Sequence, residues 1–402
     1  MNELGILKTS SSADLANNLE WTKTGTLAVT DLGNTISTTG SGYLVPVIPA
    51  HTVHLLPDWW MTVQLDNVHS TITNDFTIGI GNRSYQNNIY NAIYDVMVYI
   101  DGASQQVFVH MGGNIYPPSL IISLADYSWF DWSGAKITIH YSDFYLSILI
   151  TNPSGQLITR KYRYNMLIRR PDCSVIPNTH QSNLVGGFAI KVDNGSSTSN
   201  KIVNVKIGSN ARVGSDYLGG CDSLSVARQN YPNTTGYLYQ LSQKFAQAGN
   251  PKDIQVLAAG GAHTVDVLNI MPSITALAPK NFILEIGDND SRLNLAGWQP
   301  NYLSAVNQLC NVVTGKVYCL VVPPDPNDPH LNFYAWQTDT SPSGFMAQVA
   351  TPSKVVLIDI MVPMCTGGNI NTPNMSLLDP CDQVHWNLAG HTNVANTIYP
   401  YL

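Results

Sequence analysis

Charged residues are scarce in this chain of 402 residues. Only 12% of the residues are Asp, Glu, Lys or Arg, whereas a typical soluble protein has about 25%. The 27 acidic residues outnumber the 20 Lys and Arg residues, and the formal net charge is −7. A protein that binds nucleic acid through its phosphates needs a basic face, so we expect no nucleic-acid partner.

Cysteine and long apolar runs are also scarce. The six cysteines include no Cys-x-x-Cys pair, so we expect neither a disulfide framework nor a metal or cofactor site. Cys365 and Cys381 form either a disulfide or a pair of buried thiols. No apolar run approaches the ~18 residues of a membrane span, and the N-terminus lacks the pattern of a secretory signal. We therefore expect a soluble protein without membrane insertion, either intracellular or released with a virion.

Hydrophobic residues nevertheless make up 44% of the chain, which is enough to form folded cores. In the first half, short runs such as Met61–Leu65 and Ile137–Tyr141 alternate apolar with polar residues, and turn residues separate them. This pattern predicts an all-β antiparallel sandwich over residues 36–212. Its segment Trp132–Ile150 loosely resembles the concanavalin-like lectin sandwiches. Residues 1–35 are polar, and we expect an irregular attachment segment there.

The second half alternates strands with helices. Near-continuous apolar runs begin at Ile254, Phe282, Val317 and Val355. Helical patterns lie at about 235–248, 264–278, 302–314 and 389–401. Apolar strands of this kind belong to a parallel sheet covered on both faces, so we predict a multidomain chain with a doubly wound α/β domain over residues 213–402. In such a sheet the functional loops follow the carboxyl ends of the strands.

Four motifs occupy these loops. They read Gly219-Gly-Cys-Asp-Ser-Leu-Ser, Ala259-Gly-Gly-Ala-His-Thr, Ile286-Gly-Asp-Asn-Asp-Ser and Asp382-Gln-Val-His-Trp-Asn-Leu-Ala-Gly-His. In this order they resemble the four motif blocks of the SGNH hydrolases, also called GDSL esterases, over about residues 214–402. The resemblance implies a flavodoxin-like three-layer fold and an esterase that uses a Ser-His-Asp triad.

The resemblance also implies a role for five residues. A serine hydroxyl attacks an ester only when a neighbouring base takes its proton. Ser223 is the implied nucleophile, His385 the base, and Asp382 the carboxylate that orients the imidazole. The implied oxyanion donors are the backbone N–H groups of Ser223 and Gly261 and the side-chain amide of Asn289.

The first motif departs from the family pattern, because Cys221 stands where these enzymes usually have glycine before Asp222 and Ser223. Trp386 stands where the last motif commonly has proline. These differences keep an alternative open, in which the chain is a catalytically inactive glycan-binding or structural virion protein with the same fold.

Other residues in the motifs are expected to be structural. His263 is expected to line the pocket beside Gly261, and His391 to lie in the last helix without a chemical role. Asp288 and Asp290, which flank Asn289, are expected to hydrogen-bond the loop that carries it.

The expected function is deacylation, in particular deacetylation, of a carbohydrate or polysaccharide. A lectin-like sandwich beside the site would hold an acylated glycan near the nucleophile. Abundant Ser, Thr and Asn with little charge resembles the tail fibres and tailspikes of bacterial viruses, so a receptor-binding tail protein that forms a homo-oligomer, specifically a trimer, is a further hypothesis. The tryptophans of the sandwich either stack on sugars or lie in its core, and the core is favoured for Trp59, Trp60, Trp129 and Trp132.

Overall fold

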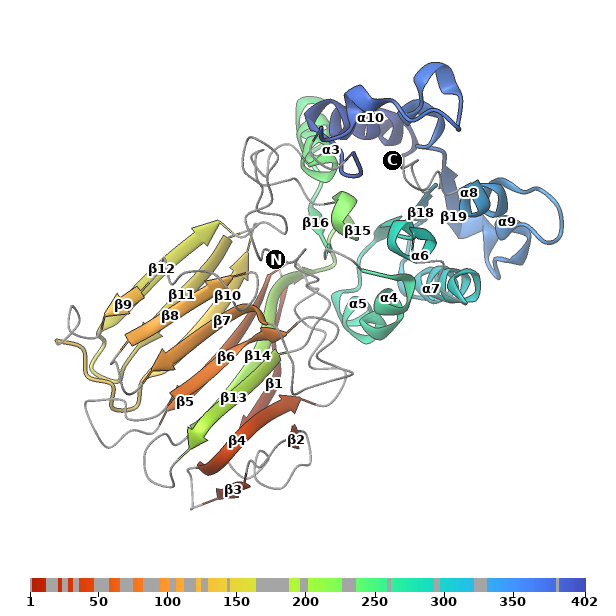
Figure 1. The fold of residues 1–402 in the computed structure, drawn as a ribbon. Coiled ribbons are helices and arrows are strands. Elements are labelled where there is room, and N and C mark those ends of the chain that lie inside the picture. The colour runs from red at the N-terminus through yellow and green to blue at the C-terminus, as the bar shows by residue number, and fades with distance from the viewer. Residues whose placement is uncertain are drawn as a thin grey trace. The chain divides into compact units, whose positions relative to one another are not determined.

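The computed structural model divides the chain into two compact units. One unit comprises residues 4–165 and 176–210, and the other comprises residues 1–3, 166–175 and 211–402. In the described residues the first consists of strands, whereas the second combines strands and helices (Figure 1). The structure describes residues 2–11, 21–23, 28–31, 36–46, 58–65, 75–81, 94–101, 106–111, 121–123, 129–142, 145–163, 188–195, 202–225, 236–258, 262–292, 297–321, 331–380 and 383–402.

The first unit is an antiparallel β-sandwich, as the sequence predicts. Its strands follow the order β12-β11-β10-β5-β14-β4-β13-β6-β7-β8-β9, with β1 paired to β14 and both β2 and β3 paired to β4. Strand β4 joins the two halves of this path, because its Ile36 pairs with Ile202 of β14 and its residues 40–44 pair with β13. The strands are β1 (Asn2–Ser11), β2 (Trp21–Lys23), β3 (Ala28–Asp31), β4 (Ile36–Pro46), β5 (Trp59–Leu65), β6 (Asp75–Gly81), β7 (Tyr94–Asp101), β8 (Gln106–Met111), β9 (Ile121–Ser123), β10 (Lys136–Ser142), β11 (Tyr145–Thr151), β12 (Leu157–Arg163), β13 (Phe188–Gly195) and β14 (Ile202–Val213).

The period-two pattern places alternate side chains in the sandwich core. Successive residues of a strand point to opposite faces, so a run that alternates apolar and polar residues buries one face. The buried residues follow this rule in four strands: Met61 and Val63, Ile137 and Ile139, Ile148 and Ile150, and Val205 and Ile207. The predicted strands at Met61–Leu65 and Ile137–Tyr141 are confirmed as parts of β5 and β10.

The tryptophans of the sandwich differ in their surroundings. Trp132 is buried in the core, and Trp60 donates a hydrogen bond from its indole nitrogen to Oδ1 of Asn210 at 3.2 Å. Trp129 is 51% exposed. The core assignment therefore holds for Trp132 and is wrong for Trp129, while the side chain of Trp59 lies outside the described residues.

The expectation of an irregular segment over residues 1–35 is wrong. Strands β1, β2 and β3 lie in this segment and pair with β14 and β4. Their Thr and Ser residues suit a strand that is held by pairing with its neighbours, and such a strand shows little apolar alternation in the sequence. The attachment role and the domain bounds at residues 35 and 212 stay predictions.

The second unit contains a five-stranded parallel sheet of order β16-β15-β17-β18-β19. Helices α3 and α10 pack together on one side of the sheet, and α4, α5 and α7 pack together on the other (Figure 1). The predicted doubly wound three-layer arrangement is therefore present. The strands are β15 (Tyr217–Cys221), β16 (Ile254–Val256), β17 (Asn281–Glu285), β18 (Val317–Leu320) and β19 (Val355–Ile358).

The α-helices of this unit are α3 (Tyr237–Gln247), α4 (Thr264–Asn269), α5 (Met271–Leu277), α6 (Asp288–Arg292), α7 (Trp298–Val312), α8 (Leu331–Thr338), α9 (Phe345–Gln348) and α10 (Leu388–Ile398). The short 3₁₀ helices are η3 (Ser223–Ser225), η5 (Pro352–Lys354), η6 (Val362–Met364), η7 (Thr366–Gly368), η8 (Met375–Leu377) and η9 (Tyr399–Tyr401). The helix predicted over 264–278 is divided at Ile270, because Pro272 in the first turn of α5 has no N–H to continue it.

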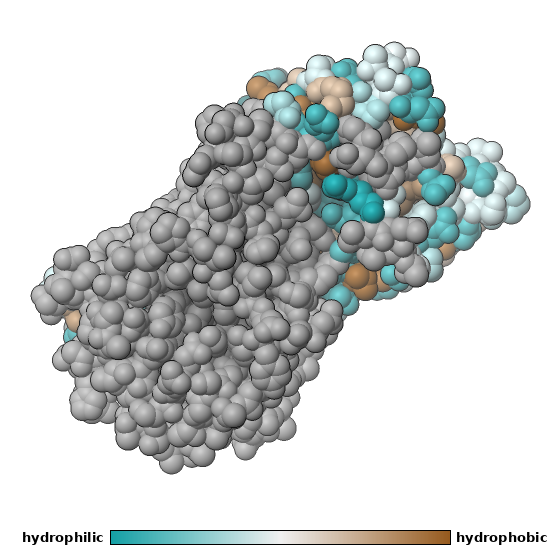
Figure 2. All heavy atoms as spheres, viewed as in Figure 1, coloured by the Kyte–Doolittle hydropathy of each residue, from teal (hydrophilic) through white to brown (hydrophobic). Residues whose placement is uncertain are grey.

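The described surface carries no dominant apolar face in the view of Figure 2. Hydrophilic residues alternate there with separate hydrophobic ones, and the exposed large hydrophobic side chains are dispersed along the chain. Within the described helices there is no segment with the length and apolarity to cross a bilayer. Cys365 is a free, buried thiol, which excludes the disulfide alternative in this structure, and Cys381 lies outside the described residues.

Candidate active site

The order of the parallel strands reverses between β15 and β17. The chain leaves β15 toward β16 on one side and leaves β17 toward β18 on the other. Ligands of doubly wound sheets bind where the strand order reverses in this way, outside the carboxyl ends of the strands. Ser223 follows β15 and Asn289 follows β17, so the topology brings two of the predicted site residues to this reversal point.

Ser223 stands on a sharp turn that directly follows β15. Gly220 has a φ of +105°, and a Cβ atom there would lie 2.5 Å from a carbonyl oxygen beyond β16, so the position requires glycine. Oδ1 of Asp222 accepts the backbone N–H of Leu224 at 2.9 Å and fastens the turn. Among residues 217–225 Ser223 alone is not buried, and the turn therefore presents this serine to solvent.

Cys221 occupies the glycine position of the motif without abolishing the turn. Its φ is 156°, in a region that glycine populates and other residues enter at a cost of about 1–3 kcal/mol. Its thiol is free and buried, and burial raises the pKa of the thiol well above its usual value. A neutral buried thiol is a poor nucleophile, so the departure from the motif adds strain rather than a second reactive group.

Asn289 connects the third motif to the second. Its Nδ2 donates to the carbonyl oxygen of Ala262 at 3.1 Å, which uses one of its two amide hydrogens. The buried Asp290 accepts the backbone N–H and the hydroxyl of Thr264, at 3.0 Å and 2.8 Å. Asp290 therefore holds the loop, as expected, and Asn289 beside it is half-buried.

The surroundings of the second motif are structural. His263 is buried and forms the N-cap of α4, where its backbone N–H donates to Oδ2 of Asp266 at 2.7 Å. Asp288 is buried and pairs with Arg292 at 3.9 Å between Oδ2 and Nη1. Gly261 lies outside the described residues, so its oxyanion role stays a prediction.

Hydrogen bonds before and after His385 hold the loop that carries this residue. The carbonyl oxygen of His385 accepts the backbone N–H of Asp379 at 2.7 Å. Oδ1 of Asn387 accepts the N–H of Gly390 at 3.0 Å and caps α10. A Cβ atom at Gly390 would lie 2.2 Å from a backbone oxygen of η8, so only glycine fits. Asp382 lies outside the described residues, and its orienting role stays a prediction.

Tyr237, the first residue of α3, links the serine turn to the histidine loop. Its hydroxyl lies 3.1 Å from Oγ of Ser225, and its ring centroid lies 5.7 Å from that of Trp386, the neighbour of His385. The ring also stacks on His391 at 6.4 Å. Burial and the nearby His385 lower the pKa of His391 to about 3, so this imidazole is neutral and structural, as expected. No motif in the sequence pointed to Tyr237.

Two buried carboxyl groups lie beneath the serine turn. Burial, followed by the charge of Glu285, raises the pKa of Asp222 well above its usual value. Burial also raises the pKa of Glu285 to about 7, although hydrogen bonds from Asp222 and Ser225 act in the opposite direction. Oγ of Ser225 donates to Oε2 of Glu285 at 2.9 Å. The sequence motifs gave no role to Glu285.

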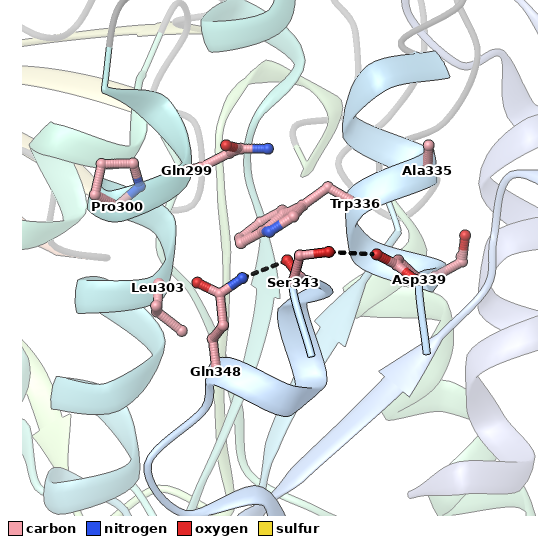
Figure 3. Close-up of a pocket in the computed structure, with 9 residues that line it drawn as sticks. Gln299, Pro300, Leu303, Ala335, Trp336, Asp339, Ser343 and Gln348 are labelled. Carbon is pink, nitrogen blue, oxygen red and sulfur yellow. Dashed lines mark hydrogen bonds between the residues drawn. The ribbon is translucent and has the colours of Figure 1, made fainter. Parts of the chain in front are cut away.

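A concave site lies away from the motifs, between α7, α8 and α9 (Figure 3). It has a volume of about 690 Å³, and the indole of Trp336 reaches into it between Gln299 and Gln348. Asp339 accepts hydrogen bonds from Ser341 and Ser343, and these bonds lower the pKa of its carboxyl group. Amides, hydroxyls and an indole suit a neutral polar ligand better than acid–base chemistry. In the described part of the chain, no group of three His, Cys, Asp or Glu residues is placed to hold a metal ion.

Comparison with solved structures gives distant likenesses. No family model and no curated protein matches the chain. The solved structure of TesA is 21% identical with a TM-score of 0.36, over 46% of this chain and 96% of that one. The acetyl xylan esterase AlAXEase is 18% identical with a TM-score of 0.36, over 46% and 98% of the two chains. Lectin II from Ulex europaeus is 9% identical with a TM-score of 0.35, over 51% and 99%. Likenesses of this size assign no function, which has to be argued from the residues.

Proposed function

We propose that the α/β unit is a serine esterase in which Ser223 is the nucleophile, His385 the general base and Asp382 the carboxylate that orients the imidazole. The observation that carries the proposal is the position of Ser223. It is the one partly exposed residue of an otherwise buried turn at the reversal of strand order, and Tyr237 connects this turn to the loop of His385.

The chemistry follows from these roles. Oγ of Ser223 attacks the ester carbonyl carbon while its proton passes to His385. The tetrahedral oxyanion accepts hydrogen bonds from the amide of Asn289 and from the backbone N–H groups of Ser223 and Gly261. His385 then gives the proton to the leaving alcohol. Water, activated by the same imidazole, releases the acid from the acyl-enzyme and restores Ser223.

Hydrolysis of p-nitrophenyl acetate tests this proposal. We expect turnover by the wild type and a loss of about 10⁴-fold or more in Ser223→Ala, because the nucleophile is removed. Ser304→Ala, at a half-buried position of α7 outside the motifs, is the matched control and should keep full activity. Equal activity of the Ser223→Ala variant and the wild type would refute the esterase.

One observation favours a second function. The φ of Cys221 strains the turn at the residue that precedes Asp222 and Ser223, which suits an inactive relative that only binds glycans or builds a virion. The same assay separates the two functions: a folded wild type without turnover, with binding to a glycan intact, supports the inactive protein.

The proposed substrate is an acylated, in particular acetylated, glycan. Its support is a composition rich in hydroxyl and amide groups and poor in charge, together with the polar pocket of Gln299 and Gln348 (Figure 3). Exchanging both glutamines for Ala should raise the KM for acetylated xylo-oligosaccharides several-fold and leave the KM for p-nitrophenyl acetate unchanged. An equal effect on both substrates would show that this pocket does not bind the glycan part of the substrate.

The proposed biological setting is a receptor-binding tail protein of a bacterial virus that acts as a homo-oligomer. Light scattering on the full chain tests the oligomer: a trimer agrees with a tail protein, and a monomer contradicts it.

A further inference from the structure

Asp222 and Glu285 lie side by side under the serine turn. Cys221, the last residue of β15, pairs in register with Glu285, the last residue of β17, and Asp222 is the next residue along the chain. Asp222 is 0% exposed and Glu285 is 1% exposed. Two carboxyl groups are thus held together where water does not reach them.

Each carboxyl group uses one oxygen to hold the turn. Oδ1 of Asp222 accepts the N–H of Leu224 at 2.9 Å, and Oε2 of Glu285 accepts the hydroxyl of Ser225 at 2.9 Å. Ser223 lies between Asp222 and the two anchored residues, Leu224 and Ser225, in the chain. Any change in the separation of the two carboxyl groups therefore acts on the nucleophile.

In the described part of the chain, the other two carboxyl oxygens lack a hydrogen-bond donor, and a proton on one of them would supply it. Oδ2 of Asp222 and Oε1 of Glu285 are buried, and neither finds a donor among the described residues. The two groups are nevertheless hydrogen-bonding neighbours. Ionised carboxylates can only accept, so a hydrogen bond between them requires one proton.

The groups that surround the pair favour keeping that proton. Asp288 of α6 adds a further negative charge, and it pairs with Arg292, so this cation offsets Asp288 first. Tyr237 of α3, Tyr302 of α7 and the thiol of Cys221 complete the described titratable neighbours. Burial raises the pKa of all three, so they remain neutral. Because these three groups carry no charge, they do not offset the repulsion between the carboxylates of Asp222 and Glu285, and a proton retained by the pair does.

We propose that Asp222 and Glu285 share one proton, and that this proton keeps Ser223 in its reactive position. The second part rests on the proposed esterase function. Both residues are positioning residues, because neither contacts the substrate. Loss of the proton leaves two carboxylates in contact without water, and their repulsion opens the turn that already bears the strained Cys221.

The sign of the pH dependence follows from this arrangement. Free carboxyl groups lose their protons near pH 4, whereas the buried pair keeps its last proton up to the higher pKa of Asp222, which burial and then the charge of Glu285 raise well above its usual value. Between these values the folded state binds the extra proton, so stability falls as the pH rises. Above the higher value the shared proton leaves, and kcat should fall about tenfold per pH unit.

The variants Glu285→Gln and Asp222→Asn replace the shared proton with a permanent donor. Their amides donate across the pair, keep the bond to Ser225 or Leu224, and preserve the single negative charge. The alkaline fall of kcat, measured on triacetin by pH-stat, should therefore be present in the wild type and absent from both variants. Asp216→Asn is the matched control, since Asp216 precedes the other end of β15 and its hydrogen bond with Lys280 lowers the pKa of its carboxyl group. This control should keep the alkaline fall.

Infrared spectroscopy detects the shared proton independently of esterase activity. At pH 7 the wild type and Asp216→Asn should show a protonated-carboxyl band that both amide variants lack, and the band should vanish as kcat falls. Absence of the band from the wild type would overturn the shared proton. An unchanged alkaline fall in Glu285→Gln and Asp222→Asn would overturn the positioning role. A wild type without esterase activity would refute the proposed function instead, and the band would then decide the shared proton alone.

Discussion

The hydroxyl of Tyr237 lies 3.1 Å from Oγ of Ser225 in the buried interior of the α/β unit. The single hydrogen of Ser225 points to Glu285, so the phenol is the donor in this contact. The same ring packs against Trp386 and His391 on either side of the histidine loop. One aromatic residue thus fixes the serine turn and the base loop against each other.

Tyr237→Phe should lower the free energy of unfolding by about 1–2 kcal/mol, because a buried hydrogen bond to Ser225 is lost while the ring contacts remain. Tyr239→Phe is the control on the same helix, since Tyr239 is 40% exposed and its hydroxyl binds only Gln243 among the described residues. Urea unfolding compares the two variants. Equal losses of stability would show that the buried hydrogen bond to Ser225 stabilises the fold no more than the exposed hydrogen bond to Gln243.

Asn289→Ala should reduce kcat by about 10²–10³-fold, because an oxyanion donor is removed, and should change KM little. Asn289→Asp should be worse, since a carboxylate repels the oxyanion and donates no hydrogen. Loss of the bond to Ala262 also lowers the thermal midpoint of both variants. Normal turnover by a folded Asn289→Ala enzyme would limit Asn289 to holding the loop.

Cys221→Gly should be at least as stable as Cys221→Ala, against the usual rule that glycine in a strand interior costs about 0.5–1 kcal/mol relative to Ala. The inversion follows from the φ of 156°, which strains Ala and not Gly. Chemical unfolding of the two variants measures the difference. If Ala is the more stable by the ordinary amount, the turn is unstrained at this residue.

Ser223→Ala and His385→Ala should each reduce kcat by a similar number of orders of magnitude, and the double variant should lose little more. Residues that act in one proton transfer are not additive. Measured losses that multiply in the double variant would show that the two side chains act independently.

Much of the α/β unit was predictable because its signals are local. Apolar runs predicted β16 to β19 at Ile254, Phe282, Val317 and Val355, and the order of the motifs placed Ser223 and Asn289 after neighbouring strands. Motif spacing also marked Asn387 and Gly390, whose roles as cap and close-approach residue needed coordinates.

The rest depends on contacts between distant parts of the chain. Tyr237 meets Trp386, and Glu285 meets Asp222, only because the sheet places them together, and neither pair leaves a pattern in the sequence. The strands within residues 1–35 were missed for the same reason, since β2 and β3 acquire their structure by pairing with β4.

Labelling with a fluorophosphonate tests the central claim most directly, because this reagent forms a covalent bond with a serine only when a base activates it. Intact-mass and peptide analysis of the wild-type chain should show one adduct, on Ser223. Ser223→Ala should take up no label, and His385→Ala should react at least 100-fold more slowly. A wild-type chain that remains unlabelled, or one that carries the label on another residue, would contradict the assignment of Ser223 as the nucleophile.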